Sequence, residues 1–375
     1  MIQVFKTDED YKKWLNGQTL PSGIVVYVSD DETMYFSTNN IKGELKTYKC
    51  EKDEVIQYPP LIYSAKSAGS TITVNGETMT LEQGDNMVLE YPTAITSVTA
   101  TNNTALTYIQ IPNTVTSIGE DTFLGCSSLV SVNIPESVKS IGNGSFYGCS
   151  SLVSVNIPES VKTIDDYAFN KCTALASVTL PNSLISIGHA AFDYCKSLLS
   201  ITIPEGVTSI NSLTFNECYA LASVTLPNSL ISIDKQAFSA CSSLVSITIP
   251  EGVTSIGQNA FSRCAALASV TLPNTLVSIG KSAFMQCAAL ASVTLPNSLI
   301  SIGDSAFNSC KSLLSITIPN SVEKIDGYAL ANCSNLTDFN FNGTKAQWAS
   351  ITLVTDWKYN APFTVVHCSD GDVTL

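Results

Sequence analysis

The sequence predicts a solenoid of short parallel β-strands, because three types of residue recur with a single period. Each column keeps a step of 23 residues: cysteines from 126 to 333, prolines from 112 to 319 and phenylalanines from 123 to 307. Leu330 takes the tenth place of the phenylalanine column. Such a period over ten copies indicates structural repeats that stack along one axis and bury their apolar side chains between neighbours.

Each repeat begins with a predicted strand. In residues 131–134, Ser-Val-Asn-Ile, polar and apolar side chains alternate, which is typical of a strand with one buried face. Pro135 follows at once and ends the strand, because proline has no N–H for a ladder and a fixed φ.

The rest of the repeat predicts short extended and helical segments. Val138 and Ile141 point inward from a second extended piece, and Gly142 permits a turn. Phe146 and Cys149 are three residues apart, as on one side of a short helical turn.

The phenylalanine and cysteine columns are the predicted core, represented by Phe123, Phe146, Phe169, Phe192, Cys126, Cys149, Cys172 and Cys195. Spacings that suit a metal, such as C-x-x-C, do not occur. Disulfides between neighbouring repeats would break the uniform stack. We therefore expect a ladder of reduced thiols that act as small hydrophobic side chains. The states of Cys50 and Cys368, which lie outside the column, stay open.

The repeat signature L-x-x-[VI]-x-[IL]-P, then [VL]-x-x-I-[GD], then [AS]-F-x-x-C resembles the BspA-like, or Treponema pallidum-type, leucine-rich repeats. It covers about ten copies between residues 106 and 335. The resemblance implies a leucine-rich-repeat solenoid, with short parallel β-strands lining one face and short helical or extended segments on the other. It also implies that the function is adhesion or protein binding.

The chain divides into three predicted parts: residues 1–95, 96–335 and 336–375. The first part does not repeat, and we expect a small, mostly β domain that caps or docks the array. Residues 25–36 and 70–80 each predict a hairpin, the second around Asn75-Gly76, with a break at Pro59-Pro60 and a short helix over 10–15. The third part resembles the C-terminal cap of many BspA-like arrays, in which Trp348, Ile351 and Trp357 would cover the last coil.

Composition and charge exclude several functions. The net charge is −13 and Arg263 is the only arginine, so we expect no nucleic-acid binding and little affinity for anionic membranes or polyanionic glycans. No apolar run is long enough for a membrane helix. The acidic start of the chain does not resemble a signal peptide, so we expect no ordinary secretory route.

Catalytic, metal and cofactor sites are not predicted. His189 and His367 are the only histidines, and no known catalytic or nucleotide-binding motif is present. The pairs Asp165-Asp166 and Asp370/Asp372 could touch a cation, but turns also use Asp for backbone reasons. We therefore expect no enzyme.

Two surfaces are candidates for binding. The outward residues of the strands include Tyr108, Gln110, Ser131, Asn133, Ser177, Thr179, Ser200, Thr202, Ser246 and Thr248. They form either a ladder that keeps the face soluble or a flat face for a repetitive partner such as a glycan. The variable positions around each phenylalanine and cysteine include Glu120, Asp121, His189, Tyr194, Lys235, Gln258, Arg263, Lys281 and Met285. These residues could discriminate between partners, although free drift at exposed positions explains the same variety.

The leading hypothesis is a displayed phage virion appendage that recognises a host protein or glycan. Residues 25–36 resemble N-terminal segments of structural proteins from gut-bacterial phages, which anchor a displayed domain on the particle, so residues 1–95 would dock to a larger assembly at the virion surface. The alternatives are a bacterial or protist adhesin at the cell surface or outside the cell, and an intracellular scaffold that binds a protein.

Overall fold

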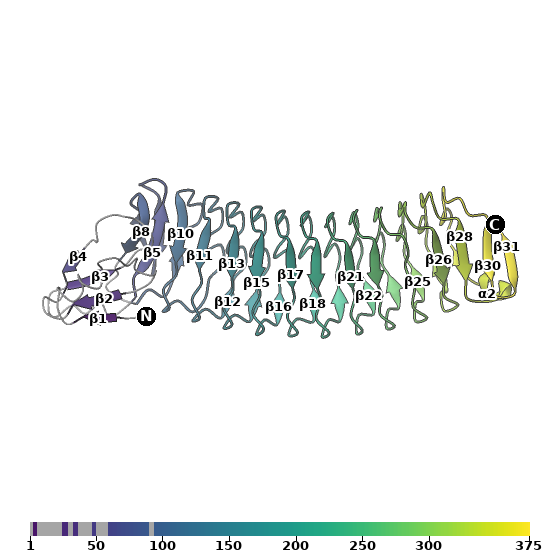
Figure 1. The fold of residues 1–375 in the computed structure, drawn as a ribbon, viewed down its shortest axis with the longest axis horizontal. Coiled ribbons are helices and arrows are strands. Elements are labelled where there is room, and N and C mark those ends of the chain that lie inside the picture. Colours follow the sequence, from purple (N-terminus) through teal and green to yellow (C-terminus); the bar gives the residue numbers. More distant parts are fainter. Residues whose placement is uncertain (1–2, 6–24, 29–32, 37–46, 50–58, 90–93) are drawn as a thin grey trace.

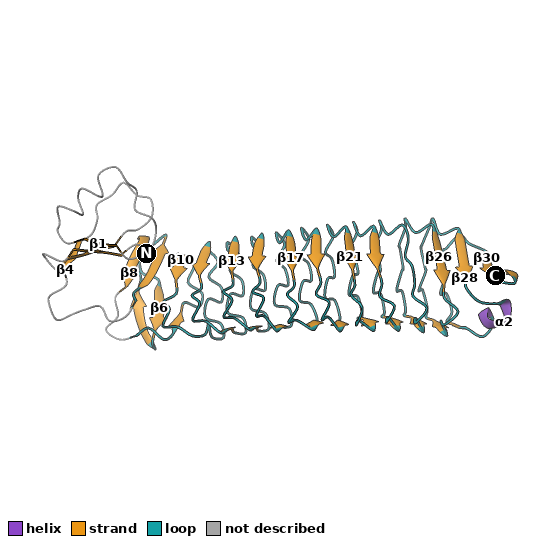
Figure 2. Cartoon of the chain, turned by 60° about the horizontal axis from the view of Figure 1, so that its bottom comes forward, coloured by secondary structure: helices purple, strands orange, loops and turns teal. Residues whose placement is uncertain are grey.

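The protein is an elongated solenoid, seen in Figure 1 as a row of similar coils. The computed structural model describes residues 3–5, 25–28, 33–36, 47–49, 59–89 and 94–375. Each coil contains a strand on one side and a shorter strand on the other, so two lines of strands run along the molecule (Figure 2). The predicted leucine-rich-repeat solenoid is therefore confirmed.

The first line of strands begins where the sequence alternates polar and apolar residues. Its outward side is called the strand face below. The line contains β10 (Leu106–Gln110), β11 (Ser131–Asn133), β13 (Ser154–Asn156), β15 (Ser177–Thr179), β17 (Ser200–Thr202), β19 (Ser223–Thr225), β21 (Ser246–Thr248), β23 (Ser269–Thr271), β26 (Ser315–Ile318), β28 (Asp338–Phe341) and β30 (Val365–Cys368).

The second line of strands follows the proline. It contains β12 (Ser140–Ile141), β14 (Thr163–Ile164), β16 (Ser186–Ile187), β18 (Ser209–Ile210), β20 (Ser232–Ile233), β22 (Ser255–Ile256), β24 (Ser278–Ile279), β25 (Ser301–Ile302), β27 (Lys324–Ile325) and β29 (Thr352–Leu353). Neighbours in this line pair in parallel with a register shift of one repeat, as in Ile141 with Ile164. Between the two lines the proline closes a turn, in which Val138 N–H donates to the Pro135 carbonyl (3.1 Å).

Between β13 and β23, strands of the first line pair in twos rather than in one continuous sheet. Parallel ladders join β13 to β15, β17 to β19 and β21 to β23, whereas no ladder joins β15 to β17 or β19 to β21. From β17 to β23 this alternation follows the two repeat types in the sequence, one reading Ser-Val-Thr-Leu-Pro-Asn and the other Ser-Ile-Thr-Ile-Pro-Glu. Near the C-terminal end, β26, β28 and β30 pair continuously.

The segment from phenylalanine to cysteine is not helical, so the predicted helical turn is wrong. Local bonds span three residues, as from Cys149 N–H to the Phe146 carbonyl (3.1 Å), and other amides donate to the next coil, as from Phe146 N–H to the Ala168 carbonyl (2.7 Å). Two residues per repeat also have left-handed backbone, for example Tyr167 (φ 56°) and Lys171 (φ 59°). A helix cannot continue through such residues.

The core is a stack of phenylalanine rings, as the sequence predicts. The rings from Phe123 to Phe307 are fully buried, and neighbours stack with centroids 5.1–5.6 Å apart. The column cysteines are also fully buried. The eight residues predicted for the core, Phe123, Phe146, Phe169, Phe192, Cys126, Cys149, Cys172 and Cys195, are each 0% exposed.

Gly142 has a role that differs from the predicted one. Its φ is not positive, so it does not provide a left-handed turn. A Cβ atom at this position would lie 2.8 Å from the backbone of Gly119 in the preceding coil. The equivalent Gly280 and Gly303 approach the preceding backbone in the same way. Glycine is therefore favoured here because two coils approach closely.

The N-terminal part contains two groups of strands. One sheet has the order β1 (Gln3–Phe5), β2 (Val25–Val28), β3 (Thr33–Phe36) and β4 (Thr47–Lys49). The antiparallel pair β2 and β3 confirms the hairpin predicted over 25–36. The predicted helix over 10–15 and Cys50 lie outside the described residues.

The second group joins the solenoid directly. It contains β5 (Leu61–Ala65), β6 (Thr71–Val74), β7 (Glu77–Thr80), β8 (Gly84–Leu89) and β9 (Val98–Thr99). The pair β6 and β7 confirms the second hairpin, with Asn75 and Gly76 at positive φ as a tight turn requires. Strand β5 pairs antiparallel with β10, so residues 61–89 cap the first coil.

The C-terminal part closes the other end. Helix α2 (Lys345–Trp348) begins with a capping box formed by Thr344 and Gln347. The predicted cap residues Trp348, Ile351 and Trp357 are buried, and both tryptophan rings contact Phe339. Strand β31 (Gly371–Thr374) then turns back on β30.

Candidate functional site

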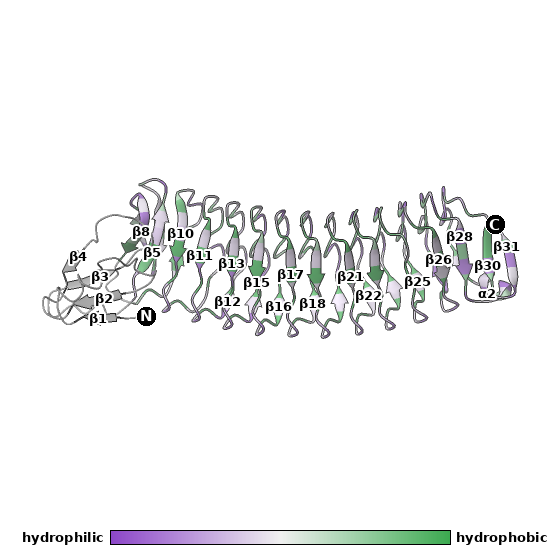
Figure 3. Cartoon of the chain, in the orientation of Figure 1, coloured by the Kyte–Doolittle hydropathy of each residue, from purple (hydrophilic) through white to green (hydrophobic). Residues whose placement is uncertain are grey.

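The strand face presents rows of small polar side chains, and both hydrophilic and hydrophobic residues occur along the strands of the solenoid (Figure 3). Of the ten residues predicted for this face, seven are exposed: Asn133, Ser177, Thr179, Ser200, Thr202, Ser246 and Thr248. Tyr108, Gln110 and Ser131 are half-buried at the first coils. Burial raises the pKa of Tyr108. The structure therefore brings the predicted residues onto one continuous face, with less accessible ones at its N-terminal end.

A shallow depression interrupts this face where β15 and β17 are not paired. It has a volume of about 270 Å³ and is lined by residues that include Val178, Leu180, Ser200 and Thr202. Val178 and Leu180 are half-buried, whereas Ile201 of the next coil is buried. The face is therefore not uniformly polar, because the missing ladder leaves aliphatic side chains partly accessible.

The turn edge is the surface formed by the segments that run from three residues before each phenylalanine to one residue after each cysteine. Among the predicted variable residues, Glu120, Lys235, Gln258, Arg263 and Lys281 are exposed, and Asp121, His189, Tyr194 and Met285 are half-buried. Three of them, Asp121, Tyr194 and Arg263, have left-handed backbone. These predicted residues follow successive coils along one edge and do not converge on one pocket.

Some neighbours of these variable positions are buried and hence structural. Asp193 accepts hydrogen bonds from the amides of Asn170 (3.1 Å) and Asn216 (2.9 Å) in the coils on either side. Burial raises the pKa of Asp193, and the two amides counteract this effect only in part. This carboxyl group therefore belongs to a polar ladder within the coil stack.

A cluster of tyrosines and lysines on the turn edge was not predicted as a unit. The Tyr–Lys cluster comprises Tyr147, Lys171, Tyr194, Lys196, Glu217 and Tyr219. Lys171 donates a hydrogen bond to the hydroxyl of Tyr147, and its Nζ lies 4.9 Å from the centroid of that ring. Lys196 Nζ lies 5.6 Å from the Tyr194 ring and 5.7 Å from the Tyr219 ring.

The carboxylate of Glu217 holds the two tyrosines of this cluster. Tyr219 donates a hydrogen bond to it, and hydrogen bonding to Glu217 also raises the pKa of Tyr194. The pKa of Tyr219 is raised to about 12, mainly by the same carboxylate. Both phenols therefore stay protonated at neutral pH. Of the cluster residues, Tyr194 alone was among the predicted variable positions, because the contacts that join the cluster run between neighbouring coils.

The cysteine column makes regular hydrogen bonds as well as apolar contacts. From Cys149 onward each column thiol donates to the carbonyl of the phenylalanine one repeat earlier, as in Cys172 to Phe146 and Cys218 to Phe192 (both 3.2 Å), whereas Cys126 donates to Ala100. Burial raises the pKa of these thiols, to about 12 for Cys126, Cys264 and Cys333. The column therefore remains protonated and unreactive at neutral pH. Cys368 is free and only half-buried.

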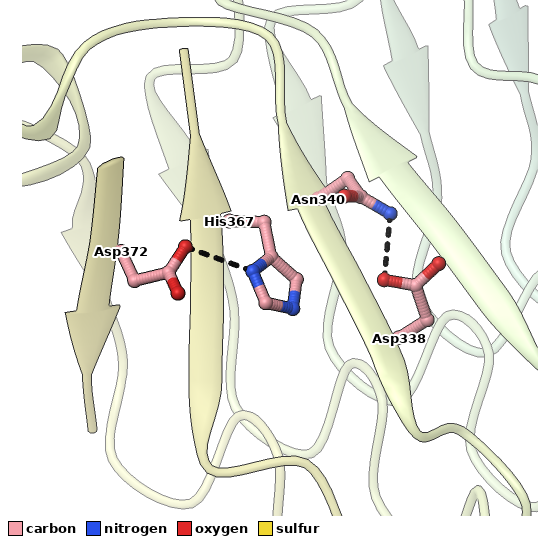
Figure 4. A network of polar contacts seen from close by, with 4 residues as sticks. All are labelled: Asp338, Asn340, His367 and Asp372. Atoms are coloured by element: carbon pink, nitrogen blue, oxygen red, sulfur yellow. Dashed lines mark hydrogen bonds and ion pairs between the residues drawn. The ribbon is translucent and has the colours of Figure 1, made fainter. Parts of the chain in front are cut away.

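Three of the four aspartates that could have held a cation, Asp166, Asp370 and Asp372, have structural partners. Asp372 pairs with His367 across β30 and β31 (2.9 Å), and in the neighbouring strand Asn340 donates to Asp338 (3.0 Å; Figure 4). Asp370 accepts from the Lys345 N–H at the start of α2 (2.8 Å). Asp166 accepts from the His189 N–H (2.6 Å). Within the described residues, no group of three or more His, Cys, Asp or Glu side chains is arranged to hold a metal.

No helix in the described part of the chain is long and apolar enough to span a membrane.

Comparison with known proteins places the repeats in one family. The model of the BspA type leucine rich repeat region matches residues 94–222, 174–274 and 208–337. No curated protein matches the chain.

Several solved structures are similar to this chain. A leucine rich cell surface protein from Faecalibacterium prausnitzii is 29% identical, with 68% of this chain and 93% of that chain covered and a TM-score of 0.39. A leucine-rich repeat protein from Bacteroides ovatus is 27% identical, covering 76% and 89%, with a TM-score of 0.46. The leucine-rich repeat protein of Treponema pallidum is 30% identical, covering 55% and 82%, with a TM-score of 0.34. The family match spans well over half of the sequence, so the chain belongs to the BspA-type leucine-rich-repeat family.

Proposed function

We propose that this chain is a non-enzymatic adhesion protein, displayed at a cell surface, that binds an extended protein or glycan along its strand face. The observation that carries the proposal is the succession of exposed hydroxyl pairs from β15 to β23, one Ser and one Thr on each strand. Neighbouring strands lie about 4.8 Å apart, so this row extends over roughly 20 Å.

A repetitive partner suits this face better than a small substrate does. Each strand offers the same two hydroxyls, which both donate and accept hydrogen bonds. The depression between β15 and β17 adds accessible aliphatic atoms from Val178 and Leu180. Long, shallow surfaces of solenoids are suited to binding large partners. The BspA-type repeats support the same class of function, because the family resemblance implies adhesion or protein binding.

The test uses the full chain, since β5 of the N-terminal part covers the first coil of the solenoid. Labelled protein is applied to an array of extracellular matrix proteins and purified polysaccharides, beside an unrelated solenoid of similar size and charge. Saturable binding to at least one matrix protein or polysaccharide, absent for the unrelated solenoid, is expected. Equal signals from the two solenoids on every spot would refute adhesion.

A role at a virion surface is a second proposal, in which residues 1–95 dock the solenoid to a particle. Its support is that β1–β4 form a sheet of their own, which shares no ladder with the solenoid in the described residues. Sedimentation of native lysate, probed with an antibody to the array, tests this role. Comigration with virus-sized particles is expected, and a slowly sedimenting or envelope-bound species would rule it out.

A further inference from the structure

We propose that the Tyr–Lys cluster binds a saccharide that carries a single carboxylate, such as a terminal sialic or uronic acid. This site lies on the turn edge and is separate from the strand face, so it adds a second binding surface to the proposed adhesion function.

The composition of the cluster departs from the rest of the array. The position after each column cysteine is Ser, Thr or Ala in most repeats, but it is Lys196 and Tyr219 in two successive coils. The position before the cysteine is Lys171 in the coil of Cys172 and Tyr194 in the next coil, which also contains Lys196. Tyr219 is 39% exposed, and the two lysines are exposed as well. Neither the stack of phenylalanines nor the strand ladders require these side chains.

The two ammonium groups are available to an anion. Lys171 and Lys196 make contacts with tyrosines, and neither has a carboxylate in ion-pair distance among the residues that the structure describes. The cluster also contains the carboxylate of Glu217, which accepts the hydrogen bond from Tyr219. Its residues therefore carry two positive charges and one negative charge, in contrast with the overall charge of −13.

The tyrosines determine which anion fits. Tyr219 donates its hydroxyl hydrogen to Glu217, so the lone pairs of this phenol oxygen remain as acceptors. A partner must therefore bring a hydroxyl donor to this oxygen, an apolar ring face to the aromatic rings and a negative group to the lysines. An acidic sugar carries all three on one ring, whereas an acidic peptide has few hydroxyl donors.

A single carboxylate also agrees with the charge of the whole protein. A polyanion would meet a surface that is negative overall and would be repelled away from the cluster. A terminal acidic sugar places one negative charge beside Lys196, which lies near the rings of Tyr194 and Tyr219, and leaves the rest of the glycan neutral. The same chemistry occurs in sialic acid and in uronic acids, so the two sources must be separated by experiment.

The experiment measures binding of the full chain to sialyllactose, glucuronic acid and neutral lactose by titration calorimetry or saturation-transfer NMR. Binding of one or both acidic sugars, and none of lactose, is expected, and comparison of the two identifies the source. Lys196→Gln should lower the affinity about tenfold or more, because it removes a hydrogen bond to a charged group. Tyr219→Ala should also weaken binding.

Lys311→Gln is the matched control, because Lys311 occupies the same repeat position as Lys196 and is equally exposed, with no tyrosine at the flanking positions. It should leave the affinity unchanged. All three variants change surface residues, and their melting curves should overlay that of the parent protein. The proposal is overturned if no acidic sugar binds, if a Glu-rich peptide binds as tightly as the sugars, or if Lys311→Gln and Lys196→Gln reduce binding equally.

Discussion

The stack of phenylalanine rings allows the contribution of ring contacts to be separated from that of simple burial. Phe215 is fully buried between Phe192 and Phe238, with centroids 5.6 and 5.4 Å away. Phe307 is equally buried, but it stacks only on Phe284 (5.4 Å), since Leu330 occupies the next coil. Phe215→Leu therefore removes two ring pairs, whereas Phe307→Leu removes one.

The magnitude follows from that difference. The change of shape from phenylalanine to leucine is common to both variants and costs about 1 kcal/mol of unfolding free energy. Each lost ring pair costs a further 0.5–1.5 kcal/mol or so. Phe215→Leu should therefore be about 0.5–1.5 kcal/mol more destabilising than Phe307→Leu. The expected total for Phe215→Leu is roughly 2–4 kcal/mol.

The assay is urea unfolding of the full chain, followed by circular dichroism, with the m-value checked for each variant. Because ends of a repeat array can fray, Ile210→Val and Ile302→Val serve as position controls without rings. Both isoleucines are fully buried, and each change should cost about 1 kcal/mol. Equal costs for the two phenylalanine variants, after this correction, would refute a specific contribution of ring stacking.

Three further predictions concern backbone, thiols and pH. Ala240 has a φ of +60°, so Ala240→Gly should raise the free energy of unfolding by about 0.5–1 kcal/mol. Ala222 does not have a positive φ, so Ala222→Gly should lower the free energy of unfolding. Thermal melts measure both changes. In the native protein, iodoacetamide should label Cys368 and none of the ten column cysteines, because burial raises the pKa of those thiols. Mass spectrometry of digests measures the labelling, and alkylated column peptides before unfolding would contradict this prediction. Burial raises the folded-state pKa of Asp193, so ionisation of this carboxyl group destabilises the folded state. As the pH rises above about 4, the parent protein should therefore lose stability relative to Asp193→Asn. A difference in urea midpoint that stays constant from pH 3 to 8 would exclude the effect.

The periodic residues allowed much of the fold to be predicted. Each periodic feature reflects one local structural need that recurs from coil to coil. These features are the alternation in each strand, the proline after it and the phenylalanine and cysteine columns. The hairpin around Asn75 was predictable for the same reason, because its turn needs two residues at positive φ. The buried ends at Trp348 and Trp357 followed from large apolar side chains beyond the last repeat.

Features that depend on contacts between coils were missed. The spacing of Phe146 and Cys149 suits a helix and a chain of turns equally, and only hydrogen bonds to the next coil decide between them. The pairing of β5 with β10 joins residues more than forty positions apart, which periodicity does not report. Asp193 lies beside the predicted variable residue Tyr194, yet it is buried between two asparagines.

The Tyr–Lys cluster could have been found by aligning the repeats and marking departures from the common residue at each position. Its members belong to three positions, two residues before, one before and one after the cysteine, in neighbouring coils. Lys171 and Tyr147 are 24 residues apart, which differs from the repeat length by one. A comparison of equivalent repeat positions therefore assigns these two residues to different positions, although the structure brings them into contact.

The central claim, that the strand face binds the partner, is tested most directly by a matched pair of double variants. The first double variant, Ser177→Arg with Ser223→Arg, places two bulky side chains on β15 and β19 of the strand face. The second, Ser186→Arg with Ser255→Arg, places them at exposed positions of β16 and β22 in the second line of strands. Affinity for the strongest partner from the array would be measured for both by biolayer interferometry. We expect the first pair to weaken binding at least tenfold and the second to leave it unchanged; equal effects, or loss only with the second pair, would contradict the account.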